Sequence, residues 1–309
     1  MTMIGKLGFL GLALLTAASC KKGGTSGGSW LVGKSALMAN VDAAGKLGAD
    51  YPLETQANLY QIACRYLGEA WVVGDHGTLL YTNDAGKTWT TGVVPTTADL
   101  HALATQNSGP VFLGGDGVFL TSSDTGAHWT SVPTTASFRA VAAAQLSDTV
   151  LAVDTAGSVW SYEHGALVSR AKIPGAHGVA ISTEGDIAMI AADDGLYLSS
   201  DGGHQFAKLD VSGAFEDVRI GEDGNAVAVG AAGAIATVDA QRHVRVQHVG
   251  TADLHTVHIP DPDSIDGTGY AAGEGGQMLV THDSGATWSM GPNLGRTVFG
   301  LDEIGDFHN

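Results

Sequence analysis

The stretch Val73–Trp89, which reads VGDHGTLLYTNDAGKTW, decides the fold of this chain. It carries a glycine turn, an apolar run and then a second, polar turn. In that second turn the hydroxyl of Thr82 and the carboxylate of Asp84 can bond backbone N–H groups, as such side chains do in tight turns. Gly86 can adopt the positive φ that closes the turn, and Trp89 can bury a large apolar face between strands. The stretch therefore predicts a β-hairpin whose polar residues have a structural role.

The second half of this stretch recurs along the chain. Two copies match it fully and a third replaces only the indole: Ser122-x-Asp124-x-Gly126-x-x-Trp129, Thr281-x-Asp283-x-Gly285-x-x-Trp288 and Ser199-x-Asp201-x-Gly203-x-x-Phe206. Three weaker copies are Ser161-x-Glu163-x-Gly165-x-x-Val168, Thr237-x-Asp239 and Asn40-x-Asp42. The acidic residues stand at 42, 84, 124, 163, 201, 239 and 283, so successive units are 38 to 44 residues long. A repeat of this length predicts one four-stranded propeller blade per unit, and seven blades in all.

Each unit also has an apolar segment ahead of its glycine turn, which we expect to form the innermost strand of a blade. Six of these segments are Leu59–Ile62, Leu100–Leu103, Phe138–Val141, Ala176–Val179, Phe215–Val218 and Leu254–Val257. The seventh, Val298–Leu301, lies near the C-terminus, whereas Trp30–Asp42 has the later strands of a blade and no innermost strand before them. We therefore predict that Val298–Ile304 pairs with Trp30–Asp42, closing the ring and removing exposed sheet edges. The predicted fold class is all-β: a seven-bladed β-propeller of four-stranded antiparallel blades over residues 30–309.

The N-terminal residues have the order of a processing signal. Lys6 precedes the apolar run Leu7–Leu15, and small residues then lead to Cys20. This order resembles a bacterial lipoprotein signal, in which residues 1–19 are removed and the Cys20 thiol receives a lipid; an ordinary secretory signal is the alternative. Residues 20–29 then form a lipidated cysteine and a flexible Gly/Ser linker. The resemblance implies a bacterial cell-envelope location, lipid-anchored at the outer membrane on its periplasmic or surface face.

Composition and charge exclude some classes of function. The chain contains 44 glycines and has a formal net charge of −17, whereas a nucleic-acid-binding protein needs a basic surface to displace counterions. If Cys20 carries lipid, Cys64 can form no intrachain disulfide, and we expect it to be an inert core thiol.

The motif Thr82-x-Asp84-x-Gly86-x-x-Trp89 resembles the Asp-box, also called the bacterial neuraminidase repeat (BNR). With seven predicted blades and the phrase Val73–Trp89, the chain is most similar to the photosystem II assembly/stability factor family and to related bacterial lipoproteins. That resemblance implies an assembly chaperone that binds a membrane-protein precursor, a role associated with a basic patch. This chain is acidic instead, with arginines scattered at 65, 139, 170, 219, 242, 245 and 296. The departure counts against work on a photosystem and leaves a related duty on another envelope complex as an open alternative.

Enzymatic roles find less support in the sequence. Asp-box sialidases usually have six blades and three substrate-binding arginines, the first near the N-terminus, and no arginine precedes Arg65 here. Other glycosidases need two carboxylates at a defined separation, and no pair stands out among the many acids. A polysaccharide hydrolase or lyase with unidentified catalytic acids is therefore the alternative function. We assign no catalytic residue, metal site or cofactor.

Candidate binding residues follow from propeller geometry. The innermost strands begin on the face that carries the turns between second and third strands, and the Asp-box turns lie on the opposite face. One residue per blade, here called the mouth residues, is then expected to ring the mouth of the central channel: Tyr60, His101, Arg139, His177, Glu216, His255 and Phe299. The outer turns add a rim of Asp75, His76, Asp116, Asp154, Asp193, Asp194 and Glu274. We interpret this surface as a site for a partner with cationic or hydrogen-bonding groups; a solvated mouth without a ligand is the alternative.

Two metal hypotheses are weaker. His101, His177 and His255 fall in alternate blades, too far apart for bonds of about 2 Å to one metal ion. His255 and His258 are expected on opposite faces of one strand. The acidic loop Asp261–Asp266 could hold calcium, but a solvated loop fits its pattern better.

The sequence as a whole predicts a non-enzymatic protein-binding or assembly module. We expect it to act as a monomer, to bind an envelope or membrane protein and not to bind nucleic acid.

Overall fold

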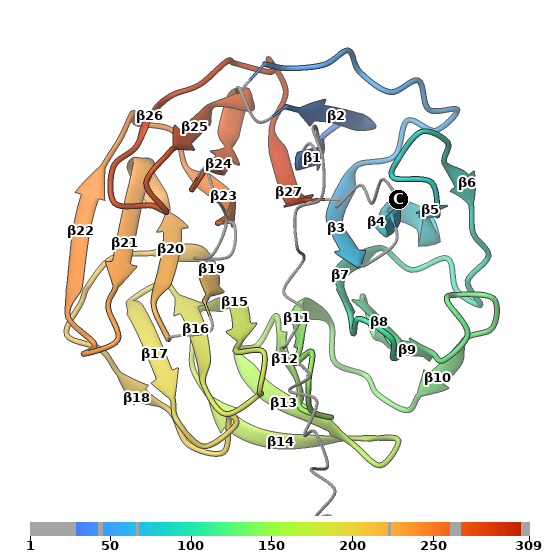
Figure 1. Ribbon diagram of the computed structural model, residues 1–309. Helices are drawn as coiled ribbons and strands as arrows, with labels where there is room; N and C mark the ends of the chain where they lie inside the picture. Colours follow the sequence, from blue (N-terminus) through green and yellow to red (C-terminus); the bar gives the residue numbers. More distant parts are fainter. Residues whose placement is uncertain (1–28, 43–45, 66–67, 222–223, 260–266, 304–309) are drawn as a thin grey trace, which may run out of the picture.

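The computed structural model describes residues 29–42, 46–65, 68–221, 224–259 and 267–303. These residues form seven antiparallel sheets arranged as the blades of a ring (Figure 1). The proposed signal peptide, Cys20, nearly all of the linker and the acidic loop 261–266 lie outside the described residues. Within the described residues, no helix is long and apolar enough to cross a membrane.

Six blades contain four strands each, and their first strand in the chain is the innermost one. Blades 1 to 3 are β3 (Leu59–Arg65), β4 (Glu69–Gly74), β5 (Leu79–Thr82) and β6 (Thr90–Thr91); β7 (Leu100–Thr105), β8 (Val111–Gly115), β9 (Val118–Ser122) and β10 (Thr130–Val132); and β11 (Phe138–Ala143), β12 (Val150–Asp154), β13 (Ser158–Glu163) and β14 (Ala166–Lys172). Blades 4 to 6 are β15 (Ala176–Ile181), β16 (Ala188–Ala192), β17 (Gly195–Ser199) and β18 (Ala207–Lys208); β19 (Phe215–Ile220), β20 (Ala226–Gly230), β21 (Ala234–Val238) and β22 (Val244–His248); and β23 (Leu254–His258), β24 (Gly269–Gly273), β25 (Met278–Thr281) and β26 (Ser289–Met290). Short 3-10 turns, η2 (Asp75–Gly77), η3 (Ala231–Gly233) and η4 (Glu274–Gly276), join the second and third strands of blades 1, 5 and 6.

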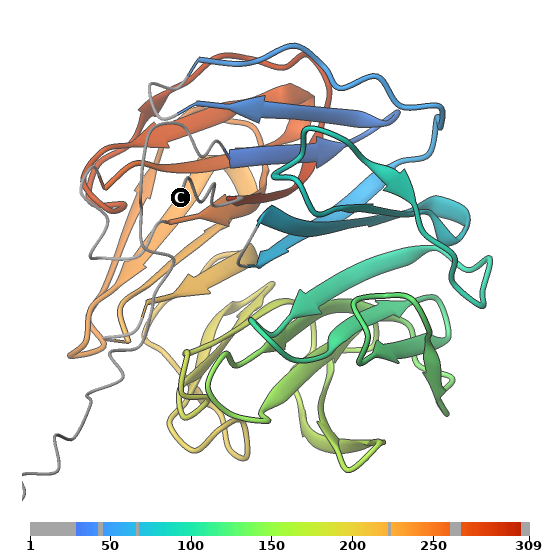
Figure 2. The ribbon, with the colours of Figure 1, turned by 45° about the vertical axis from the view of Figure 1, so that its right-hand side comes forward.

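Blade 7 is built from both ends of the described chain. Its innermost strand is β27 (Val298–Glu303), which pairs with β1 (Ser29–Gly33), and β1 in turn pairs with β2 (Leu37–Val41). Leu31 in β1 lies opposite Leu301 on one side and Ala39 on the other. Figure 2 shows the two N-terminal strands next to the C-terminal one. The predicted closure of the ring is confirmed.

The outermost position of blade 7 is less regular than in the other blades. The N–H of Gly48 donates to the carbonyl of Asn40 at 2.8 Å, and the N–H of Tyr51 donates to that of Met38 at 2.7 Å. Residues 47–51 therefore lie along β2 where a fourth strand would stand.

The hydrophobic core lies between blades and not within them. Each of the seven buried clusters joins residues of two adjacent blades, so that the interfaces form a closed circle. Between blades 1 and 2, for example, Trp71 and Leu79 pack against Leu100 and Leu113, and all four are at most 1% exposed. The second strand of a blade is buried on both faces, which explains why β8, β16 and β20 consist of apolar residues and glycine with little alternation. Each innermost strand contacts the innermost strands of both neighbouring blades.

Candidate functional site at the channel mouth

The seven mouth residues share one backbone position, which is the extra residue of a β-bulge. In β3, Leu59 pairs with Gly74 and Gln61 with Val73, so the register skips Tyr60. The same shift skips the corresponding residue of the other six innermost strands: His101, Arg139, His177, Glu216, His255 and Phe299. A bulge turns a side chain away from the regular pleat. All seven side chains are partly or fully exposed. Each belongs to the second residue of an innermost strand, so all seven lie on the same face of the propeller.

Four mouth residues in consecutive blades form an aromatic arc: His255 of blade 6, Phe299 of blade 7, Tyr60 of blade 1 and His101 of blade 2. The ring centroids of Tyr60 and His101 are 4.6 Å apart, and those of Tyr60 and Phe299 are 5.5 Å apart. His255 extends the series, with its ring centroid 5.9 Å from that of Phe299. Burial, together with a hydrogen bond to Asp75, raises the pKa of the Tyr60 hydroxyl to about 12. The tyrosine therefore stays neutral, and its hydroxyl donates a hydrogen bond to Asp75 on the rim.

The remaining three mouth residues form a charged arc across blades 3 to 5. Arg139 Nη1 lies 2.7 Å from His177 Nδ1, and His177 Nε2 lies 2.8 Å from Asp193 Oδ1. Glu216 Oε2 lies 3.4 Å from His177 Nδ1. A neutral His177 with its proton on Nε2 satisfies both short contacts, because its Nδ1 can then accept from the guanidinium. One guanidinium and two carboxylates therefore meet at His177, and the guanidinium balances only one of the two negative charges.

The outer turns supply most of the expected acidic rim. Asp116 lies 3.5 Å from His101 and its side chain is 56% exposed. Asp194 accepts from Lys208 at 2.6 Å, and Glu274 accepts from Thr297 at 3.0 Å.

Asp154 was expected in this rim, and that prediction is wrong. It is 4% exposed, and its carboxylate accepts from the backbone N–H groups of Ala156 and Ser158 and from the indole N–H of Trp160. Burial by itself would raise the pKa of Asp154, but these donors hold it below its ordinary value. It is a buried turn residue.

The Asp-box turns lie at the opposite end of the blades and use their polar groups internally. Thr82 Oγ1 donates to Asp84 Oδ1 at 2.8 Å and accepts from the N–H of Gly86 at 3.1 Å. Asp84 Oδ1 also accepts from the N–H of Thr88 at 2.9 Å. The same bond from the residue four positions on recurs at other acidic positions of the repeat: Asp42, Asp124, Asp201, Asp239 and Asp283. A hydrogen bond with His128 lowers the pKa of Asp124 to about 2. These carboxylates act as turn acceptors.

The histidines do not converge on one point. His101 faces Asp116, His177 faces Arg139 and Asp193, and His255 lies against Phe299. Among the described residues, no group of three or more His, Cys, Asp or Glu side chains has the arrangement of a metal site.

A polar cluster further along the innermost strands was missed in the sequence. His258 Nδ1 lies 3.4 Å from Asp302 Oδ1, and its Nε2 lies 3.5 Å from Glu303 Oε2. Asp302 also accepts from the N–H of Cys64 at 2.8 Å, so side chains of blade 7 link blades 6 and 1. The blades 1 to 4 carry alanine at the position of His258 and Asp302: Ala63, Ala104, Ala142 and Ala180. Comparing the aligned strands would have singled out the polar exceptions.

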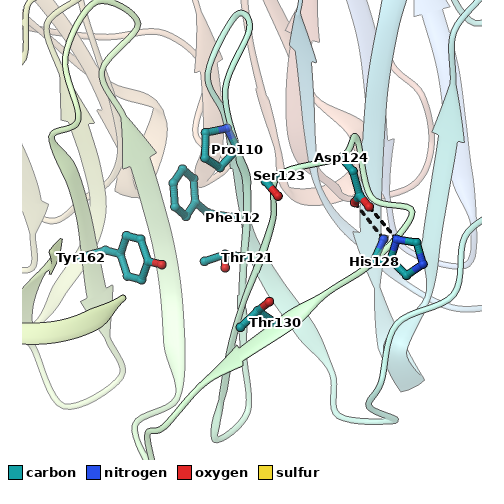
Figure 3. Close-up of a pocket in the computed structure, with 8 residues that line it drawn as sticks. All are labelled: Pro110, Phe112, Thr121, Ser123, Asp124, His128, Thr130 and Tyr162. Carbon is teal, nitrogen blue, oxygen red and sulfur yellow. Dashed lines mark hydrogen bonds and ion pairs between the residues drawn. The ribbon is translucent and has the colours of Figure 1, made fainter. Parts of the chain in front are cut away.

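A small hollow of about 200 Å³ lies between blades 2 and 3, beside the Asp-box turn of blade 2. Phe112 and Tyr162 lie on one side of it, and the hydrogen-bonded pair Asp124 and His128 on the other (Figure 3). Its volume is below the ~300–1,000 Å³ typical of small-molecule sites. Asp124 is the one acid among the residues that line it, and its carboxylate is the turn acceptor of the Asp-box. Glycoside hydrolysis needs two carboxylates, so the hollow does not have the groups for that reaction.

Residues 46–141 match the family model described as photosynthesis system II assembly factor YCF48. The chain is a BNR-type β-propeller. The expected resemblance of this propeller to the photosystem II assembly factor is thus confirmed, on blades 1 and 2 in particular. No curated protein sequence matches the chain.

Solved structures share the architecture of this BNR-type propeller at low sequence identity. A structure titled "YCF48 bound to D1 peptide" has a TM-score of 0.61 and 17% identity, covering 79% of this chain and 85% of that one. YCF48 from Cyanidioschyzon merolae has a TM-score of 0.63 and 17% identity, covering 80% and 88%. A streptogramin B lyase has a TM-score of 0.67 and 12% identity, also covering 80% and 88%. At these identities the structural likeness establishes the fold.

Proposed function

We propose that this propeller is a non-enzymatic module that binds a protein partner through its channel mouth, in the assembly or scaffolding of a membrane or envelope complex. The observation that carries the proposal is that all seven blades use the same β-bulge to present a mouth residue, and that none of the seven is an alanine or glycine. The similarity of residues 46–141 to YCF48, one structure of which is titled as bound to a D1 peptide, supports a protein ligand.

The partner proposed here is a membrane or envelope protein other than a photosystem subunit. The chain has a formal net charge of −17 and scattered arginines, whereas the photosynthetic members are associated with a basic patch. Charge complementarity sets which partners approach and in what orientation. An acidic propeller therefore suits a partner with a different surface.

The proposal also places the propeller in the bacterial envelope. Lipidation at Cys20, followed by the linker of residues 20–29, would tether the domain of residues 30–309 to the outer membrane. The sequence pattern around Cys20 supports this part of the proposal. Mass spectrometry of the mature N-terminus tests it: a diacylglyceryl Cys20 is expected, and an unmodified N-terminus elsewhere would refute the anchor.

The alternative, a polysaccharide hydrolase or lyase, is less favoured. Retaining and inverting glycosidases both need two carboxylates held about 5 to 9.5 Å apart around the scissile bond. At the mouth, Glu216 and Asp193 both face His177 and its Arg139 partner. The Asp-box carboxylates are held by their own turns.

A capture experiment tests the binding function. The full-length protein is crosslinked in native envelopes and purified, alongside a mouth variant (His101→Ala, Arg139→Ala, Glu216→Ala) and a control variant (His128→Ala, Lys87→Ala, Glu184→Ala). The control also removes one histidine, one cation and one glutamate, all exposed on the opposite face. We expect a specific partner with wild type and control, and its loss with the mouth variant. Equal capture by all three proteins, or glycan turnover that only the mouth variant loses, would refute the proposal.

A further inference from the structure

The two arcs of the mouth differ in what they leave for a ligand. In the charged arc, His177 lies 2.7 Å from Arg139, 2.8 Å from Asp193 and 3.4 Å from Glu216. A ligand group that bound to His177 would have to displace one of these three contacts. In the aromatic arc, the contacts among His255, Phe299, Tyr60 and His101 are between rings. A ligand can therefore bind over the rings of the aromatic arc without breaking the polar contacts of the charged arc.

The rings of the aromatic arc meet at tilted angles. The interplanar angles are 55° for Tyr60 and His101, 40° for Tyr60 and Phe299, and 43° for His255 and Phe299. Rings tilted in this way do not cover one another's faces as parallel stacked rings would, and all four side chains are partly exposed. The face of an aromatic ring carries partial negative charge and attracts cations.

Carboxylates on the rim add negative charge to the same arc. Asp75 interacts with the Tyr60 hydroxyl, and Asp99 lies close enough to act on it electrostatically. Asp116 adds a third carboxylate beside His101. Acidic residues alone would not define a site, but here they surround a cluster of rings that already favours a cation.

Within the described part of the chain, the protein's own cations lie over other rings. The two cation–π contacts are Arg65 over Trp71, at 4.5 Å from the ring centroid, and Lys208 over Tyr197, at 5.8 Å. Arg139, the one cationic mouth residue, faces His177 in the charged arc. Among the described residues, neither cation–π contact involves a ring of the aromatic arc, so a cation of a ligand would meet no competing cation there.

We propose that the aromatic arc binds a lysine or arginine side chain of the partner protein, over the rings of Tyr60 and Phe299. The inference rests on the proposed function, because it assumes that a protein occupies the mouth. A cation over two rings with carboxylates nearby gains ring attraction and charge complementarity together. A glutamate side chain would meet repulsion, and a glutamine side chain would gain neither interaction.

A titration of the purified full-length protein in detergent tests this site directly. Tyrosine and phenylalanine rings are labelled with carbon-13, and their NMR signals are followed during addition of three blocked glycine pentapeptides with arginine, lysine or glutamine at the centre. We expect saturable shifts of the Tyr60 and Phe299 signals with the arginine and lysine peptides, at an affinity about fivefold to tenfold higher than for the glutamine peptide. The signal of Phe206, which lies in an Asp-box turn on the opposite face, should not move. No saturable shift at Tyr60 and Phe299, or equal affinity for the glutamine peptide, would overturn the inference.

Substitutions identify the interaction that carries the affinity. Tyr60→Leu and Phe299→Leu should each abolish the preference for the cationic peptides, whereas Tyr60→Phe, which keeps the ring, should retain most of it. Phe206→Leu is the matched control on the other face. The wild-type titration decides the question even if a variant fails to fold.

The same variants separate this inference from the proposed function. If the mouth variant loses the envelope partner while Tyr60→Leu and Phe299→Leu retain it, and the cationic peptides do not bind, then the mouth binds protein without a cation subsite and only the inference fails. If the mouth variant captures the partner as well as wild type does, the proposed function fails. Binding of the arginine and lysine peptides, with loss of the partner from both leucine variants, supports both.

Discussion

One hydroxyl group organises each complete Asp-box turn. Thr82 is 2% exposed, and its Oγ1 accepts from the N–H of Gly86 and donates to Asp84. In Thr82→Val the shape of the side chain is kept, but the N–H of Gly86 loses its acceptor in a buried position. A buried donor left without an acceptor costs about 1–3 kcal/mol. We therefore expect urea unfolding to show a loss of this size.

The control for this substitution is Thr90→Val. Thr90 also donates its hydroxyl to a backbone carbonyl, that of Tyr81, but its side chain is exposed. Loss of the Thr90 hydroxyl should change the free energy of unfolding by less than about 0.5 kcal/mol. Equal losses in the two variants would show that the hydroxyl of Thr82 has no special role in the turn.

At the scale of strands, the charged cluster around His258 joins β23 to β27. Burial by itself would lower the pKa of His258, but its contacts with Asp302 and Glu303 raise it to about 9. Because the pKa in the unfolded chain is about 6.5, this stabilisation is fully present below pH 6.5 and is lost as pH rises to 9. The pKa of Asp302 is lowered against the effect of burial by its contact with His258. Its contribution is therefore present above its ordinary pKa and is lost as pH falls below it.

We expect the free energy of unfolding of the wild type to fall by about 2–3 kcal/mol more than that of His258→Gln between pH 6.5 and pH 9. Urea unfolding at the two pH values measures the difference. His128→Gln, which removes an exposed histidine beside Asp124, should follow the wild type. Parallel pH profiles of wild type and His258→Gln would contradict the assigned ion pairs.

The strands show how far sequence reasoning reaches. The innermost strands and the seven mouth residues could be located because the repeat is local: its turns and apolar segments stand at fixed distances from each acidic residue. The bulge that aims Tyr60 or Phe299 is a matter of register between strands, which the sequence of one strand does not contain. The pairs His177 with Arg139 and His258 with Asp302 form between blades, so their residues are about 38 or 44 positions apart. Asp154 was misplaced for a different reason: its donors, in Ala156, Ser158 and Trp160, all lie within six residues of it, and the turn conformation that buries the carboxylate among them is not evident from the residue types.

At the scale of the whole molecule, stability depends on closing the ring. β27 pairs with β1 and contacts the innermost strands of blades 6 and 1. Removing residues 298–309 would expose the edge of β1 and uncover the apolar interfaces on both sides of blade 7. We expect this truncated protein to aggregate or to unfold without a cooperative transition in a thermal melt.

Removal of residues 304–309 is the matched control, because it leaves β27 (Val298–Glu303) whole. That protein should melt within a few degrees of the full chain. A cooperative, soluble protein after removal of residues 298–309 would contradict the claim that the ring is closed by its two ends.

The measurement that tests the central claim most directly is site-specific photocrosslinking in native envelopes. A benzophenone amino acid replaces Phe299 at the mouth in one protein and Phe206 on the Asp-box face in another. Both positions are aromatic and partly exposed, and they lie at opposite ends of the blades. The account predicts a discrete protein adduct from position 299 and none from position 206. Adducts from position 206 alone, or the same adducts from both positions, would contradict binding at the channel mouth.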